Sequence, residues 1–276
     1  MSLAEDDVAI ELDAVQVGVA AGVGRVVAVG ARCSGLQDRR VLVGPIDPCG
    51  GCDVCRRGGA AVCPIARRRD ELGASVIAAG RWLVPLDDGL DLPVPAAAAV
   101  AGDVALAYTL YARTGVAPRE PVIVVGASPI ARFLVEILLA KGIAPTAMAD
   151  AGAWAEWLRA RGVAVARDRA AVAELVAAQS LGTKPWRVIC GDAAATASAV
   201  DLAGPRATLT LLAAPALAPI AGDVIAREVT VIGVAGAHPD LVVETAAMCA
   251  KGEIDLAGGT TQAVAEPFRT PVRSVR

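Results

Sequence analysis

The chain has 276 residues and a formal net charge of −3, with 26 lysines and arginines against 29 aspartates and glutamates. This length allows two ordinary domains, or one large one, with a sizeable core. The mildly acidic balance argues against nucleic acid or an acidic membrane surface as a partner. The first residues, MSLAEDD, lack the basic and apolar regions of a signal peptide, so we expect a cytoplasmic protein. In that reducing compartment, closely spaced cysteines bind metal more often than they form disulfides.

The first motif along the chain is a cluster that holds four of the seven cysteines. They follow the spacing C-x2-C-x2-C-x7-C, and the Pro and Gly residues at 48–51 allow the tight turn that brings such thiols together. Four thiolates fill the tetrahedral shell of zinc and leave no open position, which predicts one structural zinc per chain. An iron–sulfur cluster and thiols that are unliganded or disulfide-paired remain alternatives. The predicted ligands are Cys49, Cys52, Cys55 and Cys63.

Arginines surround this cysteine cluster in the sequence. Because four thiolates outweigh the charge of one zinc ion, we expect the arginines to offset the remaining negative charge. They are Arg56, Arg57 and the three arginines at 67–69. The three other cysteines, Cys33, Cys190 and Cys249, are expected to be small buried hydrophobic residues.

Strand and helix patterns alternate through the second half of the chain. The apolar run Val122 to Val125 lies between a proline and a glycine, as a buried parallel strand would, and apolar residues at helical spacing follow it. This alternation predicts an α/β fold with a doubly wound parallel sheet. Further strands are expected at 144–150, near 163, and at 186–192, 206–215 and 228–236, with helices at 130–138, 154–161, 170–178 and 194–204.

The turn after the first of these strands is a candidate dinucleotide site. In a G-x-G-x-x-G/A fingerprint, Gly126, Ser128 and Ala131 occupy the three key positions, and Asp150 ends the next strand. An acidic residue there favours NAD over NADP, because it would repel a 2′-phosphate. Ser128 replaces a glycine at which the backbone must approach the pyrophosphate closely. The alternative is a sheet without a cofactor whose turn merely retains one glycine.

Taken together, these segments resemble the zinc-containing medium-chain alcohol dehydrogenases. The stretch RVLVGPIDPCGGCDVCRRGGAAVC is similar to the structural zinc lobe of that family, and GVAPREPVIVVGASPIA to the opening of its cofactor domain. The resemblance implies a GroES-like β domain over residues 1–95, completed by 257–276, and a Rossmann domain over 96–256. It also implies NAD(P) as cofactor and assembly into homodimers or tetramers. Only about seventeen residues precede Gly18, so we expect a reduced β domain.

The residues that hold the catalytic zinc in this family are not matched. Gly18, Val19 and Ala20 stand in place of its Gly-His-Glu motif, and Ala101 or Gly102 in place of the last ligand. A catalytic zinc needs three protein ligands and an open position. We therefore expect the zinc-polarised hydride chemistry of the family to be absent or replaced.

Few other side chains are candidates for catalysis. Tyr108, Tyr111 and Ser128 could donate a hydrogen bond to a substrate oxygen, although tyrosines three apart on a helix more often pack against each other. Asp192 follows a strand at the edge where ligands bind, and it could equally cap the next helix. The only histidine, His238, is expected at the surface or in an interface.

Two functions are consistent with this sequence. The first is an NAD(H)-linked oxidoreductase that acts without catalytic zinc on a small carbonyl compound, alcohol or activated alkene. The second is a non-catalytic descendant of the same family that serves as a binding or partner subunit. The absent zinc ligands favour the second, and Asp150 together with the layout of the cofactor domain favours the first.

Overall fold

The computed structural model describes residues 3–16, 18–86, 90, 92–117, 119–178, 186–212 and 221–256. The chain divides into two compact units. The first contains the residues up to Gly102 together with Val242–Lys251, and the second contains Asp103–Leu241 together with Gly252–Asp255. The predicted return of residues 257–276 to the β domain concerns residues outside those described.

A five-stranded antiparallel sheet, in the order β6-β1-β2-β3-β7, forms the body of the first unit. Its core lies on one face, because Val8 and Ile10 of β1 are fully buried while Glu11 and Asp13 are exposed. Residues Asp7–Val15 form a single long strand, β1. The bounds are β1 Asp7–Val15, β2 Gly22–Val29, β3 Arg40–Val43, β6 Ser75–Ala79 and β7 Val84–Pro85.

Helices complete the first unit. Helix α2, which packs on β1, β2 and β3, runs into a turn of π-helix, η4. The helical bounds in this unit, apart from the lobe described next, are η1 Ala31–Leu36, η3 Gly80–Trp82, α2 Val94–Ala99, η4 Val100–Val104 and α9 Val242–Ala250.

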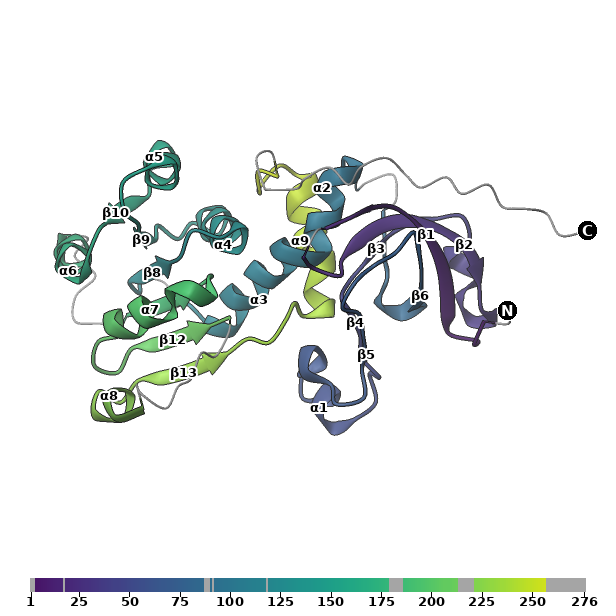
Figure 1. The fold of residues 1–276 in the computed structure, drawn as a ribbon, viewed down its shortest axis with the longest axis horizontal. Coiled ribbons are helices and arrows are strands. Elements are labelled where there is room, and N and C mark those ends of the chain that lie inside the picture. The colour runs from purple at the N-terminus through teal and green to yellow at the C-terminus, as the bar shows by residue number, and fades with distance from the viewer. Residues whose placement is uncertain are drawn as a thin grey trace, which may run out of the picture. The chain divides into compact units, whose positions relative to one another are not determined.

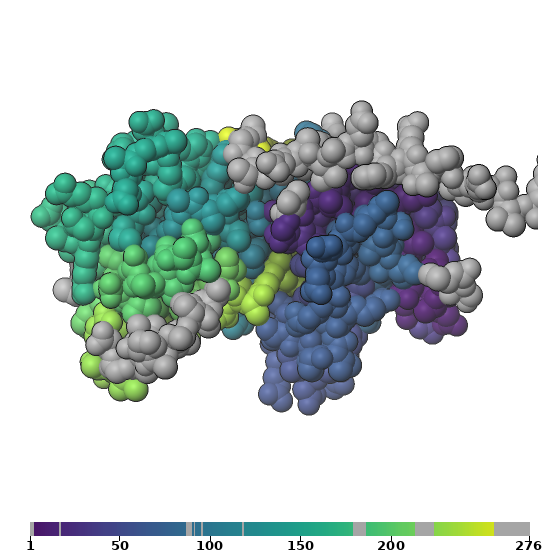
Figure 2. Space-filling model, in the orientation of Figure 1, coloured from purple at the N-terminus to yellow at the C-terminus, as the bar shows by residue number. Residues whose placement is uncertain are grey.

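A small lobe carries the cysteine cluster and projects from the first unit (Figure 2, blue). Its base is a two-stranded antiparallel sheet of β4 and β5, in which Asp47 lies opposite Arg67. Helix α1 and the 3₁₀ turn η2 lie between these strands in the sequence, and α1 forms the end of the lobe away from β4 (Figure 1). The bounds are β4 Ile46–Asp47, α1 Asp53–Arg56, η2 Ala60–Val62 and β5 Arg67–Arg68.

The second unit is built on a six-stranded parallel sheet in the order β10-β9-β8-β11-β12-β13. The strand order reverses beside β8, because β9 and β10 extend the sheet on one side and β11 to β13 on the other. This confirms the predicted doubly wound sheet. The strands are β8 Val122–Val125, β9 Thr146–Met148, β10 Ala164–Ala166, β11 Arg187–Cys190, β12 Thr208–Leu211 and β13 Thr230–Gly233.

Helices follow these strands in sequence, as predicted, and some pack against the sheet (Figure 1). One core cluster joins α6 and α7 to alternate residues of the strands, including Ile123 and Val125 of β8. Helix α3 contacts β11 and β12 and also packs on α4, and the buried hydroxyls of Thr114 and Thr210 lie 2.9 Å apart. The helical bounds are α3 Ala105–Thr114, α4 Pro129–Ala140, α5 Ala153–Ala160, α6 Arg169–Ala178, η5 Ala193–Ala195, α7 Thr196–Leu202, α8 Ala221–Ala226 and η7 Pro239–Leu241.

Within the part of the chain that is described, no helix combines the length and the apolar character needed to cross a membrane.

Candidate metal centre and nucleotide crevice

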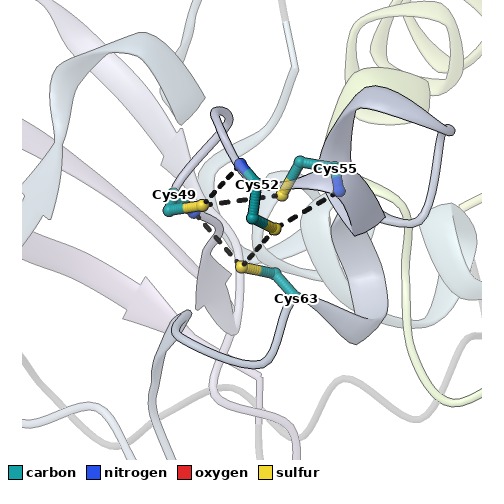
Figure 3. Close-up of side chains that lie close together, drawn as sticks. All are labelled: Cys49, Cys52, Cys55 and Cys63. Atoms are coloured by element: carbon teal, nitrogen blue, oxygen red, sulfur yellow. Dashed lines mark hydrogen bonds between the residues drawn. The ribbon is translucent and has the colours of Figure 1, made fainter.

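The four predicted metal ligands converge in the lobe (Figure 3). Their sulfur atoms all lie within 4.8 Å of one another. The Sγ atoms of Cys49 and Cys55 are 3.9 Å apart, and so are those of Cys52 and Cys63. In a tetrahedral site with Zn–S bonds of about 2.3 Å, the sulfurs stand about 3.8 Å apart. The donor set therefore fits one zinc ion.

The same geometry separates the zinc interpretation from its alternatives. A disulfide needs sulfurs about 2.05 Å apart, which none of these pairs approaches, and all seven cysteines are free. An iron–sulfur cluster binds its cysteines on separate iron atoms bridged by sulfide, so its ligands must be spread more widely than those of one ion. A single metal ion suits the observed spacing best.

Local backbone structure aims the thiols at one point. Gly50 and Gly58 adopt positive φ angles of 68° and 78°, which few other residues adopt without strain. Cys52 caps helix α1, its sulfur accepting a hydrogen bond from the Cys55 amide at 3.5 Å. The Cys52 amide donates to the Cys49 sulfur at 3.3 Å. These N–H···S bonds stabilise thiolates before any metal binds.

The cysteine pKa values reflect these hydrogen bonds. Backbone N–H groups of Gly51 and Cys52 lower the pKa of Cys49 to about 6. The Cys49 amide lowers the pKa of Cys63, whereas burial raises that of Cys55 to about 12. In the metal-free lobe Cys49 therefore loses its proton more readily than Cys55, whose proton a metal must displace.

Two of the arginines expected to offset the thiolate charge serve another purpose. Arg67 donates two hydrogen bonds to Asp7, and Arg69 forms an ion pair with Asp47, whose side chain is only 4% exposed. These contacts fasten the base of the lobe to the β-sheet. Carboxylates thus pair with both Arg67 and Arg69, and the expectation that they offset the thiolate charge stays a prediction.

Two residues far away in the sequence support the lobe and were not predicted. Arg81 donates to the carbonyl oxygen of Cys49 at 2.7 Å, and the indole N–H of Trp82 donates to that of Pro48 at 2.7 Å. They fix the backbone at the first ligand. Nothing in the spacing of the cysteines indicates residues more than thirty positions later.

The predicted dinucleotide turn lies at the carboxyl end of β8, where the strand order reverses. Gly126 has a φ angle of 115°, and a side chain there would bring its Cβ within 2.6 Å of the Asp192 Cβ. Ser128 caps helix α4: its hydroxyl accepts a hydrogen bond from the Ala131 amide at 3.2 Å and donates to the Gly191 carbonyl at 2.6 Å. The hydroxyl that was expected to obstruct a pyrophosphate is therefore turned toward Gly191.

Three further residues complete the geometry around this turn. A Cβ at Gly191 would lie 2.9 Å from the Cα of Ala131. The close approach of helix α4 to the end of strand β11 therefore requires Gly191 as well as Ala131, the small residue at the last position of the fingerprint. Asp150 is exposed, two residues beyond the end of β9. Asp192 caps the helical turn η5 by accepting from the Ala194 amide at 3.0 Å, which is the second of its two predicted roles. These residues fit a dinucleotide outside the carboxyl ends of β8 and β9.

Comparisons with known proteins complete this picture. No family model matches the sequence, and no curated protein matches it. Among solved structures, galactitol-1-phosphate dehydrogenase from Escherichia coli is similar with a TM-score of 0.75 and 18% identity, over 93% of this chain and 85% of that chain. D-arabinose dehydrogenase from Sulfolobus solfataricus is similar with a TM-score of 0.72 and 17% identity, over 92% and 91%.

A structure described as a short chain alcohol dehydrogenase from Escherichia coli CFT073, complexed with NADH, is also similar. Its TM-score is 0.74 at 17% identity, over 93% of this chain and 83% of that chain. The chain has the medium-chain dehydrogenase fold. At such identities the likeness establishes the fold alone.

In this medium-chain dehydrogenase fold, the positions matched to the catalytic zinc ligands carry small or apolar side chains. Val19, at the position of the histidine ligand, is partly buried, and Gly102 lies in the π-helical turn η4. The side-chain oxygen of Gln16 occupies the space that a Cβ at Gly102 would need. Among the described residues, the four cysteines form the one group of three or more His, Cys, Asp or Glu side chains placed to hold a metal ion. That the protein binds no catalytic zinc stays a prediction.

The other candidate side chains of this dehydrogenase fold are engaged in packing. The rings of Tyr108 and Tyr111 meet edge to face, with centroids 5.6 Å apart, and the Lys141 ammonium lies 5.3 Å from the Tyr108 ring. His238 has a side chain only 15% exposed, with Nδ1 3.6 Å from an Asp240 oxygen. His238 is thus partly buried in the single chain, and its expected place at the surface or in an interface stays a prediction.

Proposed function

We propose that the chain is an oxidoreductase that binds NAD(H) and transfers hydride to or from a small carbonyl compound, alcohol or activated alkene without catalytic zinc. The observation that carries the proposal is the turn from Gly126 to Ser128, which opens helix α4 beside the strand where the sheet order reverses. Doubly wound sheets bind their ligands outside the carboxyl ends of the strands at such a point. The medium-chain dehydrogenase fold supports the same assignment.

Each residue of the crevice has a defined part in this proposal. The amino terminus of α4 faces the pyrophosphate with the positive end of its helix dipole. Asp150 accepts hydrogen bonds from the ribose hydroxyls and repels a 2′-phosphate, so the cofactor is NAD rather than NADP. When bound, the nicotinamide supplies or accepts the hydride. The protein binds and orients the reactants.

A second candidate function is a non-catalytic descendant that uses the same fold as a binding or partner subunit. The burial of Tyr108, which is 5% exposed and whose ring packs against Tyr111 and Lys141, favours it, because a hydroxyl donor must be able to reach a substrate. The hydroxyl of Ser128 likewise donates to the Gly191 carbonyl. In the arrangement observed, Ser128 therefore does not offer its proton to a substrate.

Titration with NADH separates the two functions. The purified full chain is titrated to millimolar concentration while nicotinamide fluorescence is followed, with NADPH as the matched comparison. We expect saturable binding of NADH, weaker binding of NADPH, and a loss of this discrimination in Asp150→Asn. The absence of NADH binding would remove the oxidoreductase proposal. Binding without oxidation of NADH by aldehydes, ketones, quinones or enones would favour the non-catalytic subunit.

For the lobe, we propose one structural zinc bound by the four cysteines. The sulfur spacing and the N–H···S bonds support it, and the absence of an open position assigns the ion to folding rather than to reaction. Its loss would unsettle the lobe, because metal binding and folding are coupled at such sites.

We also propose that the chain assembles into a homodimer or tetramer. Among the described strands, β13 is an edge strand, and its Val231 side chain is 37% exposed. An unpaired edge is a template for pairing with a second copy. Light scattering after size exclusion tests this: we expect a dimer or larger for the native chain and a smaller species for Val231→Lys. A native monomer would contradict the proposal.

A further inference from the structure

Helix α5 carries an aromatic stack that the proposed function has not used. Trp154 and Trp157 lie three residues apart, with ring centroids separated by 5.0 Å and planes inclined by 14°. The guanidinium carbon of Arg161 lies 4.0 Å from the centroid of the Trp157 ring. Because the residues at 154, 157 and 161 follow helical spacing, they form one stripe along the helix.

Charged groups hold one end of this stack in place. Arg161 donates to Glu136 of α4 at 2.6 Å and to Asp255 at 2.8 Å. Arg132 of α4 approaches Trp157 as well, with its guanidinium carbon 5.0 Å from the ring centroid, and pairs with Asp255 at 3.5 Å. Trp157 is therefore fixed by two guanidinium groups and one indole.

The other end of the stack lies toward the carboxyl edge of the sheet. Trp154 is in the first turn of α5, which begins directly after Gly152, and it lies only four residues after Asp150. Trp154 is partly exposed. Its indole N–H has no hydrogen-bond partner among the described residues. Stacking on Trp157 is therefore the contact that orients the Trp154 ring. A planar ligand could extend the stack at this end.

We propose that Trp154 is the stacking surface for the purine base of the bound dinucleotide. The proposal rests on the proposed function, in which Asp150 binds the ribose that carries this base. A base attached to that ribose lies within reach of the first turn of α5, where its ring continues the series Trp154, Trp157, Arg161. Because Arg132 and Arg161 already hold Trp157 in place, less side-chain freedom is lost when the base binds.

The experiment measures the affinity of the full chain for three ligands: NADH, ADP-ribose and nicotinamide mononucleotide. We expect Trp154→Leu, which keeps apolar bulk but loses the aromatic plane, to bind NADH and ADP-ribose roughly tenfold or more weakly, as loss of base–aromatic stacking does. Its affinity for nicotinamide mononucleotide should not change. Trp154→Phe, the matched control, should keep most of the affinity, and ADP-ribose should quench tryptophan fluorescence in the native chain.

Each result has a distinct meaning. If Trp154→Leu binds ADP-ribose as tightly as the native chain, the base does not stack on Trp154, and the oxidoreductase proposal stands unaffected. If the native chain binds neither NADH nor ADP-ribose, both proposals fail. Thermal unfolding of each variant accompanies the titrations. If Trp154→Leu does not fold, Trp154→Phe and Trp154→His test the proposal instead, because both side chains keep an aromatic ring on which the base can stack. A tenfold loss of ADP-ribose affinity in both folded variants would contradict stacking.

Discussion

Substitution of Asp47 by alanine should destabilise the first unit more than any exposed charge change. The Asp47 carboxylate is 4% exposed, and it accepts from Arg69, whose side chain is 9% exposed, and from the Ala79 amide at 3.0 Å. Removing one partner of a buried ion pair costs about 3–5 kcal/mol, because the other charge is left uncompensated. Arg69 would keep hydrogen bonds to the carbonyls of Gly44 and Ile77, at 3.1 and 3.2 Å. We therefore expect the lower end, about 3 kcal/mol.

Urea denaturation of the zinc-loaded chain measures this loss as a change in midpoint at constant m-value. Asp47→Asn, which keeps an acceptor without the charge, should fall between alanine and the native residue. The matched control is Glu5→Ala, which removes an ion pair with Arg32 whose side chains are 66% and 68% exposed, and it should cost less than about 0.5 kcal/mol. A loss below about 1 kcal/mol for Asp47→Ala would refute the view that this pair fastens the lobe.

Three further predictions concern Gly126, the buried Cys249 and the zinc-binding cysteines. Gly126→Ala should lower stability by about 1–3 kcal/mol in thermal unfolding, since φ is 115° and the new Cβ would meet Asp192, whereas Gly204→Ala, with nothing near its Cβ, should change little. Burial raises the pKa of the Cys249 thiol from 9.0 to about 12. The stability that its neutral thiol contributes is therefore complete below pH 9 and is lost as the pH rises toward 12. In Cys249→Ala, the free energy of unfolding should fall less steeply with pH over this alkaline range. Because protons compete with the metal for the four thiolates, zinc should be retained at about pH 8 and released on acidification, as a chromogenic chelator would report. Release already at about pH 8 would contradict binding by four thiolates.

Much of the fold follows from short-range sequence patterns. Val122 to Val125 form a strand with the predicted bounds, because a run of apolar residues between Pro121 and Gly126 suits only the centre of a parallel sheet. The four cysteines meet because their ligand spacing is local, and the glycines between them supply the turns. In both cases the interactions that decide the structure lie within a few residues.

The contacts that escape prediction are those between distant segments. Arg81 and Trp82 fix the backbone of the lobe from more than thirty residues away, and no pattern in the sequence pairs them with Pro48 or Cys49. The rotamer of Ser128 was equally out of reach, since it depends on the carbonyl of Gly191 on the neighbouring strand. Sequence spacing identifies which residue types gather at a site, whereas tertiary packing decides which way each side chain turns.

Elemental analysis of the purified chain most directly tests the proposal that the four cysteines bind one structural zinc and that no catalytic zinc is bound. We predict about one zinc per chain, bound by the four cysteines, and close to none in Cys52→Ser. Two zinc ions per native chain, with one remaining in Cys52→Ser, would mean that a second ligand set exists, and the account of a dehydrogenase fold without catalytic zinc would be wrong.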